Sequence, residues 1–177
     1  MKVAKFGGTS LANAEQIKKV CDIILSDNER RVVVVSAPGK RDKNDIKVTD
    51  LLIACANKQL ETGDSSAELE AVVKRFKDIA DDLNLDNSII DEIRRDLEER
   101  IKLDTSHPGM FMDAMKAAGE DNSAKLVAAY LNSIGKKAHY VSPKQAGLLM
   151  SSEFGNAQVL PESFENLKML KNYDGIV

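Results

Sequence analysis

The sequence predicts an α/β protein built around a mainly parallel sheet. Residues 2–6 form a short apolar strand pattern that leads into Gly7-Gly8, and apolar side chains recur at helical spacing over about 12–26. Val32-Val33-Val34-Val35 is a continuous β-branched run, which is typical of a strand covered on both faces. A strand, a helix and a second strand in this order indicate a parallel βαβ unit.

The composition indicates a soluble, globular domain and argues against several kinds of partner. With 177 residues, of which 43% are hydrophobic and 30% charged, the chain can build one sizeable core and is not a disordered segment. A net charge of −3 provides no basic surface for nucleic acid or an anionic membrane. No apolar run approaches the roughly 20 residues of a membrane span, and no signal-peptide pattern is present. We therefore expect a cytoplasmic protein, with Cys21 and Cys55 as buried apolar residues.

A polar segment follows the second predicted strand. Residues 37–47 contain Pro38, Gly39 and six charged side chains, a composition that predicts a mobile loop. Ligands of open α/β sheets bind outside the carboxyl ends of the strands. The chemistry of this protein is therefore expected at Gly7-Gly8 and at this loop.

Three helical patterns come next, over residues 49–61, 66–83 and 88–102. The last two are amphipathic and are predicted to form a helical hairpin that turns near residues 84–87. Their apolar stripes are interpreted as packing faces, with an interaction surface for another protein as the alternative.

The rest of the chain predicts further helices and two more strands. A short helix through Phe111 and Met115 is expected to stop at Gly119, and a new helix over about 121–134 to end at Gly135. The other expected elements are a strand at 138–141, a short helix at 144–149, an irregular segment or short strand at 154–160, a helix from Pro161 to about Asn172, and the first residues of a buried strand at 175–177. Since such a short strand pairs poorly, the chain is expected to be part of a longer protein.

The motif Lys5-Phe6-Gly7-Gly8-Thr9-Ser10 has the features of a phosphate site. Two glycines leave room for a bulky anion, and Thr9 and Ser10 are suited to cap a following helix whose N-terminal amides favour phosphate. Lys5 adds a mobile positive charge, which suits phosphoryl transfer. The alternative is a plain strand–turn–helix junction with a surface lysine. The spacing matches neither a Walker A loop nor GxGxxG.

The same motif resembles the signature of aspartokinases, within the amino-acid kinase superfamily. Three further stretches resemble the family in the expected order, namely Val32 to Ala37, Gly119-Glu120 followed by Ser123, and Phe154 to Ala157. The resemblance implies a three-layer sandwich with a mainly parallel central sheet, the amino-acid kinase (carbamate kinase-like) fold, incomplete at the C-terminus. Residues 1–177 would form the N-terminal portion of the catalytic domain, with a helical hairpin insertion at about 66–102, and without the nucleotide-binding half and the ACT regulatory domains.

The resemblance also implies an activity. Aspartokinases use ATP to phosphorylate the side-chain carboxylate of L-aspartate to 4-phospho-L-aspartate, the first step toward lysine, threonine and methionine. ATP and Mg²⁺ are the implied cofactors, L-aspartate is the implied partner, and a homo-oligomer is expected for the full-length protein. No metal-ligating residue is assigned, and these residues alone are expected to be inactive.

The family's site residues carry over to eight positions. Lys5 would contact the transferred phosphoryl group. The positions implied for nucleotide phosphates are Lys5, Gly7, Gly8, Thr9 and Ser10, and those implied for substrate are Ser36, Thr49 and Glu120.

Structural alternatives exist for the substrate residues. Ser36 could satisfy backbone groups at a strand end, Thr49 could be a helix N-cap, and Glu120 could gain from a helix dipole without any ligand. For the whole chain, the alternatives are a sister kinase acting on acetylglutamate, glutamate or carbamate, and a non-catalytic assembly module that uses helices 66–102.

Overall fold

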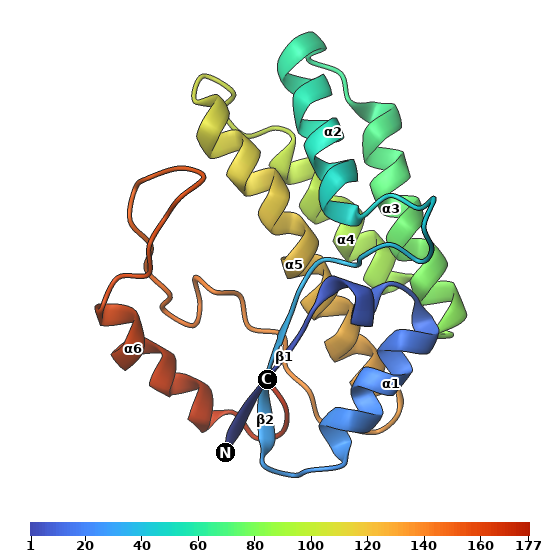
Figure 1. Ribbon diagram of the computed structural model, residues 1–177, viewed down its shortest axis with the longest axis vertical. Coiled ribbons are helices and arrows are strands. Elements are labelled where there is room, and N and C mark those ends of the chain that lie inside the picture. The colour runs from blue at the N-terminus through green and yellow to red at the C-terminus, as the bar shows by residue number, and fades with distance from the viewer.

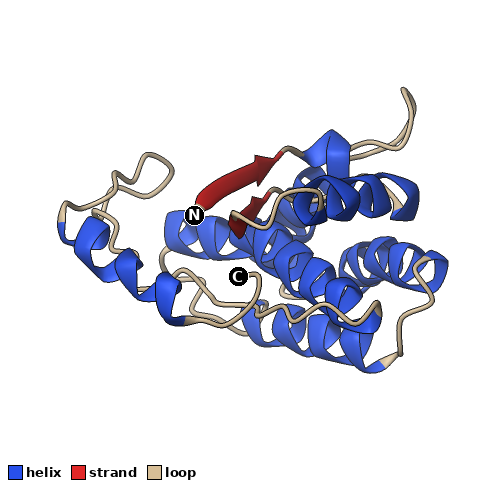
Figure 2. Cartoon of the chain, turned by 90° about the horizontal axis from the view of Figure 1, so that it is seen from below, coloured by secondary structure: helices blue, strands red, loops and turns tan.

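A computed structural model describes all 177 residues (Figure 1). Its elements in chain order are β1 (Lys2–Phe6), the 3-10 helix η1 (Gly8–Leu11), α1 (Ala14–Leu25), β2 (Arg30–Val35), α2 (Val48–Thr62), α3 (Ser66–Asp82), α4 (Ser88–Arg100), α5 (Pro108–Ser133), α6 (Glu162–Asn166) and the 3-10 helix η2 (Leu167–Asn172). In two views the segment with α6 extends away from the other helices (Figures 1 and 2). The expected α/β architecture is confirmed.

The sheet is parallel, as the βαβ pattern predicts. β1 pairs with β2 in a register that places Lys5 beside Val34 and Phe6 beside Val35. On the other edge of β2, the amide of Val33 donates to the carbonyl of Val177 at 2.7 Å, and Ile176 forms a parallel bridge with Ala138. The residues predicted to begin a buried strand at 175–177 therefore extend the sheet beyond β2.

One face of the two strands packs against helices. Phe6, Val33 and Val35 lie on this face and contact the core, with α1 and α5 packed on β2. Alternation along the strands puts Lys5 and Val34 on the opposite face, where Val34 is 48% exposed. Helices thus cover the strands on one side only, where the valine run predicts cover on both faces, and Lys5 points away from that core.

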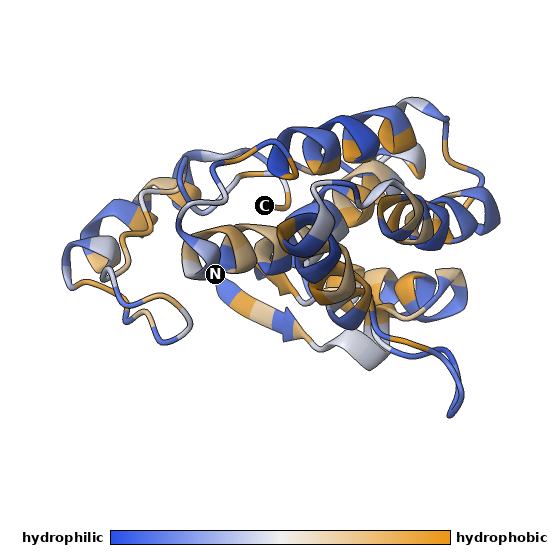
Figure 3. Ribbon diagram, turned by 90° about the horizontal axis from the view of Figure 1, so that it is seen from above, coloured by the Kyte–Doolittle hydropathy of each residue, from blue (hydrophilic) through white to orange (hydrophobic).

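Helices α2 to α5 form the main body of the protein. The amphipathic hairpin is confirmed: α3 packs on α4, and its apolar side chains, including the fully buried Phe76, join the core. Figure 3 shows hydrophobic and hydrophilic stretches alternating along the helices. Because these apolar stripes are buried within the chain, they are packing faces, and the assembly module loses its proposed interface. None of the helices is both long and apolar enough to cross a bilayer.

The predicted helix break at Gly119 is wrong, because α5 runs without interruption from Pro108 to Ser133. Gly119 lies inside it and has a packing role: a Cβ there would be 2.7 Å from the Cβ of Ala37 and 3.1 Å from Cδ1 of Leu52. The glycine lets α5 approach the segment that leaves β2. A glycine lowers the intrinsic helix propensity of this part of the chain, and tertiary packing overrides that unfavourable term.

Four other expectations need correction. The short helix at 144–149 is a series of turns, and residues 138–141 contribute a single bridge at Ala138 where a full strand was expected. The helix from Pro161 divides into α6 and η2. Thr9 and Ser10 lie within η1, and α1 is capped instead by Asn13, whose Oδ1 accepts from the amide of Gln16 at 3.0 Å.

Both thiols are expected to react with dithiobis(nitrobenzoate) at pH 8 at least about 100-fold more slowly in the folded protein than in a small thiol. Cys21 and Cys55 are each 1% exposed, and burial raises the pKa of Cys21 to about 12 and also raises that of Cys55. The thiolate is the reacting species, so protection follows from both effects. The same assay in guanidinium is the control, and equal rates in both conditions would contradict the burial.

Burial of Cys21 also makes the stability of the fold depend on pH. Its folded pKa lies above the unfolded value of about 8.5, so burying the neutral thiol stabilises the fold fully below that pH. The stabilisation declines as the pH rises from there toward the folded pKa of about 12.

Candidate active site

Two glycines join the carboxyl ends of β1 and β2. The amide of Gly39 donates to the carbonyl of Gly8 at 2.8 Å, which brings the turn after β1 against the segment after β2. A Cβ on Gly39 would lie 2.6 Å from the carbonyl carbon of Gly8, and one on Gly8 would lie 2.8 Å from the carbonyl oxygen of Ala37. Only residues without a side chain allow this backbone contact.

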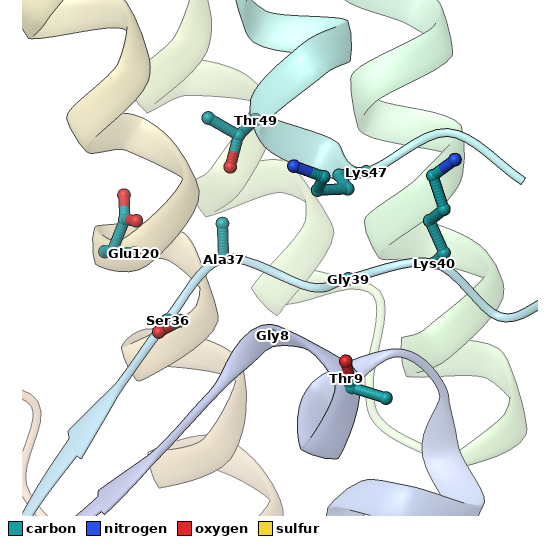
Figure 4. Close-up of a pocket in the computed structure, with 9 residues that line it drawn as sticks. All are labelled: Gly8, Thr9, Ser36, Ala37, Gly39, Lys40, Lys47, Thr49 and Glu120. Carbon is teal, nitrogen blue, oxygen red and sulfur yellow. The ribbon is translucent and has the colours of Figure 1, made fainter.

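A polar cavity of about 400 Å³ opens at this contact. Its lining comes from the turn after β1, the segment 36–47, the start of α2 and the middle of α5. The lining residues are Gly8, Thr9, Ser36, Ala37, Gly39, Lys40, Lys47, Thr49 and Glu120 (Figure 4). The cavity therefore lies at the carboxyl edge of the sheet, where the sequence predicts the chemistry.

Two hydroxyl groups of the cavity are free to bind a ligand. Ser36 uses its backbone amide to donate to the carbonyl of Phe6 at 3.1 Å, but its hydroxyl has no hydrogen-bond partner in the protein. The hydroxyl of Thr49 is also unpartnered, and Thr49 lies inside the first turn of α2, whose N-cap is Lys47. The Ser36 hydroxyl therefore does not satisfy a backbone group at the strand end, and Thr49 is not the N-cap of α2, which were the structural alternatives.

Glu120 places an unpaired carboxylate at one end of the cavity. It projects from α5, is exposed, and forms no salt bridge within the chain, whereas Lys40 lies at the opposite end of the group (Figure 4). Glu120 is 12 residues from the first residue of α5, about three helical turns, and the helix dipole acts mainly on the first turn. The dipole alternative for Glu120 is therefore not supported.

The residue after Glu120 fixes this part of α5 to α4. Asp121 accepts a hydrogen bond from Nη2 of Arg100 at 2.8 Å, and Nε of Arg100 donates to Asp96 at 2.9 Å. Tyr140 also donates its hydroxyl to Asp121, and Asn122 donates to Asp96 at 2.8 Å. These bonds limit rotation and sliding of α5 at the turn that carries Glu120.

The pKa shifts in this network keep the carboxyl group of Asp96 ionised and the hydroxyl of Tyr140 protonated. Burial by itself raises the pKa of Asp96, but the hydrogen bond and charge of Arg100 outweigh it and hold that pKa below its ordinary value. Burial and the bond to Asp121 raise the pKa of Tyr140, so its hydroxyl stays a donor at neutral pH.

Lys40 and Lys47 supply positive charge that the motif did not predict. Both line the cavity, both are exposed, and neither forms a salt bridge within the chain. The high charge of residues 37–47 was a signal in the sequence, but it did not indicate which ammonium groups face the cavity. Two cations, backbone groups and hydroxyls together suit an anionic ligand with phosphate or carboxylate oxygens.

Three predicted site residues lie outside the cavity lining. Gly7 and Ser10 flank the lining residues Gly8 and Thr9, and Lys5 is exposed on the far face of β1 without an ion-pair partner. The structure thus brings together Gly8, Thr9, Ser36, Thr49 and Glu120. Lys5 is outside this group, near the carboxyl end of β1. Their roles in binding stay predictions.

A second, larger cavity of about 930 Å³ lies between α5 and the segment 138–148. Its lining is mostly apolar, including Val127 and Leu131 of α5. Such a surface suits packing against apolar groups and does not suit an anionic ligand, so the polar cavity is the candidate site.

The sequence and the fold match a known family. The sequence model of the amino acid kinase family matches residues 1–176. The chain belongs to this family. Among amino acid kinases, aspartokinase 3 of Bacillus subtilis is 55% identical over all of this chain, which covers 39% of that protein. Chloroplast aspartokinase 2 of Arabidopsis thaliana is 30% identical over 92% of the chain, which covers 30% of that relative.

Solved structures of amino acid kinases agree with this assignment. The crystal structure of Escherichia coli aspartokinase III in complex with aspartate and ADP superposes with a TM-score of 0.77 at 29% identity, over 99% of this chain and 39% of that one. The amino-acid kinase fold expected from the sequence is therefore confirmed. This chain spans 30–39% of the length of these relatives.

Proposed function

We propose that this chain provides the aspartate- and phosphate-binding part of an aspartokinase, which transfers the γ-phosphoryl group of ATP to the side-chain carboxylate of L-aspartate. One observation carries the proposal: Gly8, Ser36, Thr49 and Glu120 converge on one polar cavity in a chain that is 55% identical to an aspartokinase. The E. coli structure with aspartate and ADP supports the same substrates. Groups that hold the adenine would lie in the remainder of the protein.

The reaction places few chemical demands on the protein. An oxygen of the aspartate carboxylate attacks the γ-phosphorus, and the bond from that phosphorus to the bridging oxygen breaks, with its electron pair leaving on ADP. The nucleophile is already ionised, so no proton is transferred and no general base is needed. Catalysis then depends on positioning and on charge neutralisation.

The cavity residues are suited to these two tasks. Glu120 is proposed to pair with the α-ammonium of aspartate, and the free hydroxyls of Ser36 and Thr49 to donate to its carboxylate oxygens. Lys40 and Lys47, with the turn at Gly8, are proposed to face the phosphates.

No cluster of acidic or histidine side chains in the chain could hold a metal ion by itself. The Mg²⁺ used in phosphoryl transfer is held largely by the nucleotide phosphates and would neutralise their charge. We assign it no ligand in these residues.

Replacing Glu120 with glutamine in the full-length protein is expected to raise KM for aspartate at least about tenfold, because a charge-assisted bond is worth about 1.5–3 kcal/mol. KM for ATP should change little, since the ammonium contact belongs to aspartate. The measurement is aspartate-dependent ADP release at varied aspartate. Glu99→Gln, at an exposed glutamate of α4, is the matched control and should behave as the wild type.

A substrate panel tests the nearest rival activities. Wild-type protein should release ADP with L-aspartate and not with acetylglutamate, glutamate or carbamate. Preference for one of the other acceptors, or an unchanged KM in Glu120→Gln, would overturn the assignment to aspartate.

A further inference from the structure

A buried side chain of helix α3 bonds to the segments that border the cavity. Arg75 is 4% exposed, and its Nη2 donates to the carbonyl of Ala12 at 2.8 Å and to the carbonyl of Gly39 at 2.9 Å. Ala12 follows the turn that carries Gly8 and Thr9, whereas Gly39 begins the charged loop. One guanidinium nitrogen therefore joins the two backbone segments that form one side of the cavity.

The same nitrogen holds the far end of the loop. Nη2 of Arg75 lies 3.2 Å from Oδ2 of Asp45, and Asp45 also accepts from the backbone amide and the guanidinium of Arg41 at 2.7–2.8 Å. The amide of Val48 donates to the carbonyl of Pro38 at 3.0 Å and closes the base of the loop. The sequence predicts a mobile loop here, but these contacts tie it to α3.

The cost of burying Arg75 indicates that its position has a purpose beyond packing. Its Nε and Nη1 are buried with no hydrogen-bond partner, which is unfavourable for a charged group. An apolar side chain of similar length would fill the same space without this cost. What only the arginine provides is the set of bonds from Nη2 to the loop and the turn.

We propose that Arg75 is a positioning residue of the site: it fixes loop 39–47, and with it the ammonium groups of Lys40 and Lys47, against the turn that follows β1. Lys40 directly follows Gly39, and Lys47 lies two residues after Asp45, so both anchors act next to a cavity lysine. The inference rests on the proposed function in taking the phosphates of ATP as the ligand of these lysines.

If the loop is in its binding-competent conformation only part of the time, the apparent affinity of the protein for its ligand is reduced by that fraction. Saturating ligand restores the order, so the maximal rate is preserved. Arg75→Gln in the full-length protein is therefore expected to raise KM for MgATP about tenfold, with kcat within about twofold of the wild type. A residue needed only for stability would instead reduce the amount of active enzyme and leave KM unchanged.

Three further variants sharpen the kinetic test. Arg75→Lys keeps a charge near the point where all three contacts converge and should recover most of the affinity for MgATP. Asp45→Asn removes the loop's own anchor while the buried arginine stays, so it should raise KM for MgATP even if Arg75→Gln folds poorly. Arg95→Gln makes the same change at an exposed arginine of α4 without a salt-bridge partner, and should have no effect.

Hydrogen exchange measured by mass spectrometry gives a readout that does not need activity. Without nucleotide, peptides covering 39–48 should exchange faster in Arg75→Gln than in the wild type, whereas α4 peptides should not change. Unchanged exchange in this loop, or an unchanged KM for MgATP in folded Arg75→Gln and Asp45→Asn proteins, would overturn the positioning role. If the wild type shows no aspartate-dependent turnover, the proposed function fails, and the exchange comparison still decides whether Arg75 orders the loop.

Discussion

Replacing Gly39 with alanine is expected to lower kcat/KM for aspartate phosphorylation by the full-length protein at least about 100-fold. The new Cβ would lie 2.6 Å from the carbonyl carbon of Gly8 and 2.8 Å from the amide nitrogen of Thr9. These are backbone atoms, so the two strand ends must separate to make room. Displacing the reacting groups by about 1 Å is enough for a loss of this size. Steady-state kinetics of the purified variant measure it.

The matched control for Gly39→Ala is Gly135→Ala, at the end of α5. Gly135 has φ of +75° with no atoms near its missing Cβ, so alanine there is strained by about 1–2 kcal/mol without touching the cavity. It should lower the thermal midpoint and leave kcat/KM unchanged. If both variants lose activity in proportion to stability, the Gly8–Gly39 contact has no special role in the site.

Lys5→Ala is expected to lower kcat about 100-fold or more, as removal of one group that stabilises transition-state charge typically does. Lys5 stands at the carboxyl end of β1, is exposed, and has no ion pair to lose. The thermal midpoint should therefore change little. The measurement is single-turnover ADP formation at saturating substrates, together with a thermal melt.

Lys2→Ala on the same strand separates a role for Lys5 from a general effect of charge. Lys2 bonds to Asp27 at 2.8 Å at the opposite end of β1 and should leave kcat unchanged. An unchanged kcat in Lys5→Ala would remove Lys5 from the mechanism and leave Lys40 and Lys47 as the cations that act on the phosphates.

Local patterns were enough to predict much of this fold. The apolar strand at 2–6, the valine run of β2 and the stripes of α3 and α4 each depend on the periodicity of neighbouring residues, and each was predicted correctly. Gly119 shows where this approach fails. A glycine reads locally as a helix stop, but here it serves a close contact with Ala37, whose position the sequence does not show.

Some residues of the candidate site could also be predicted from the sequence, and others could not. Ser36 and Glu120 were found in stretches that resemble family motifs, and Thr49 was carried over from the family's substrate roles. The structure gathers all three at one cavity. Lys40, Lys47 and Arg75 were missed, since charged residues in a loop or on a helix most often face solvent. Arg75 is 36 residues from Gly39 and 63 from Ala12, and only the path of the folded chain brings these groups together.

The contact between Gly8 and Gly39 also divides the cavity into a base that does not depend on side chains and a rim that does. Its base consists of main-chain atoms, so hydrogen-bonding groups there are the same whatever side chains surround them. Its rim consists of side chains from four different segments, each replaceable without moving the base. Under the proposed function, single substitutions at the rim would therefore change the choice of acceptor, whereas the main-chain groups of the base would stay the same.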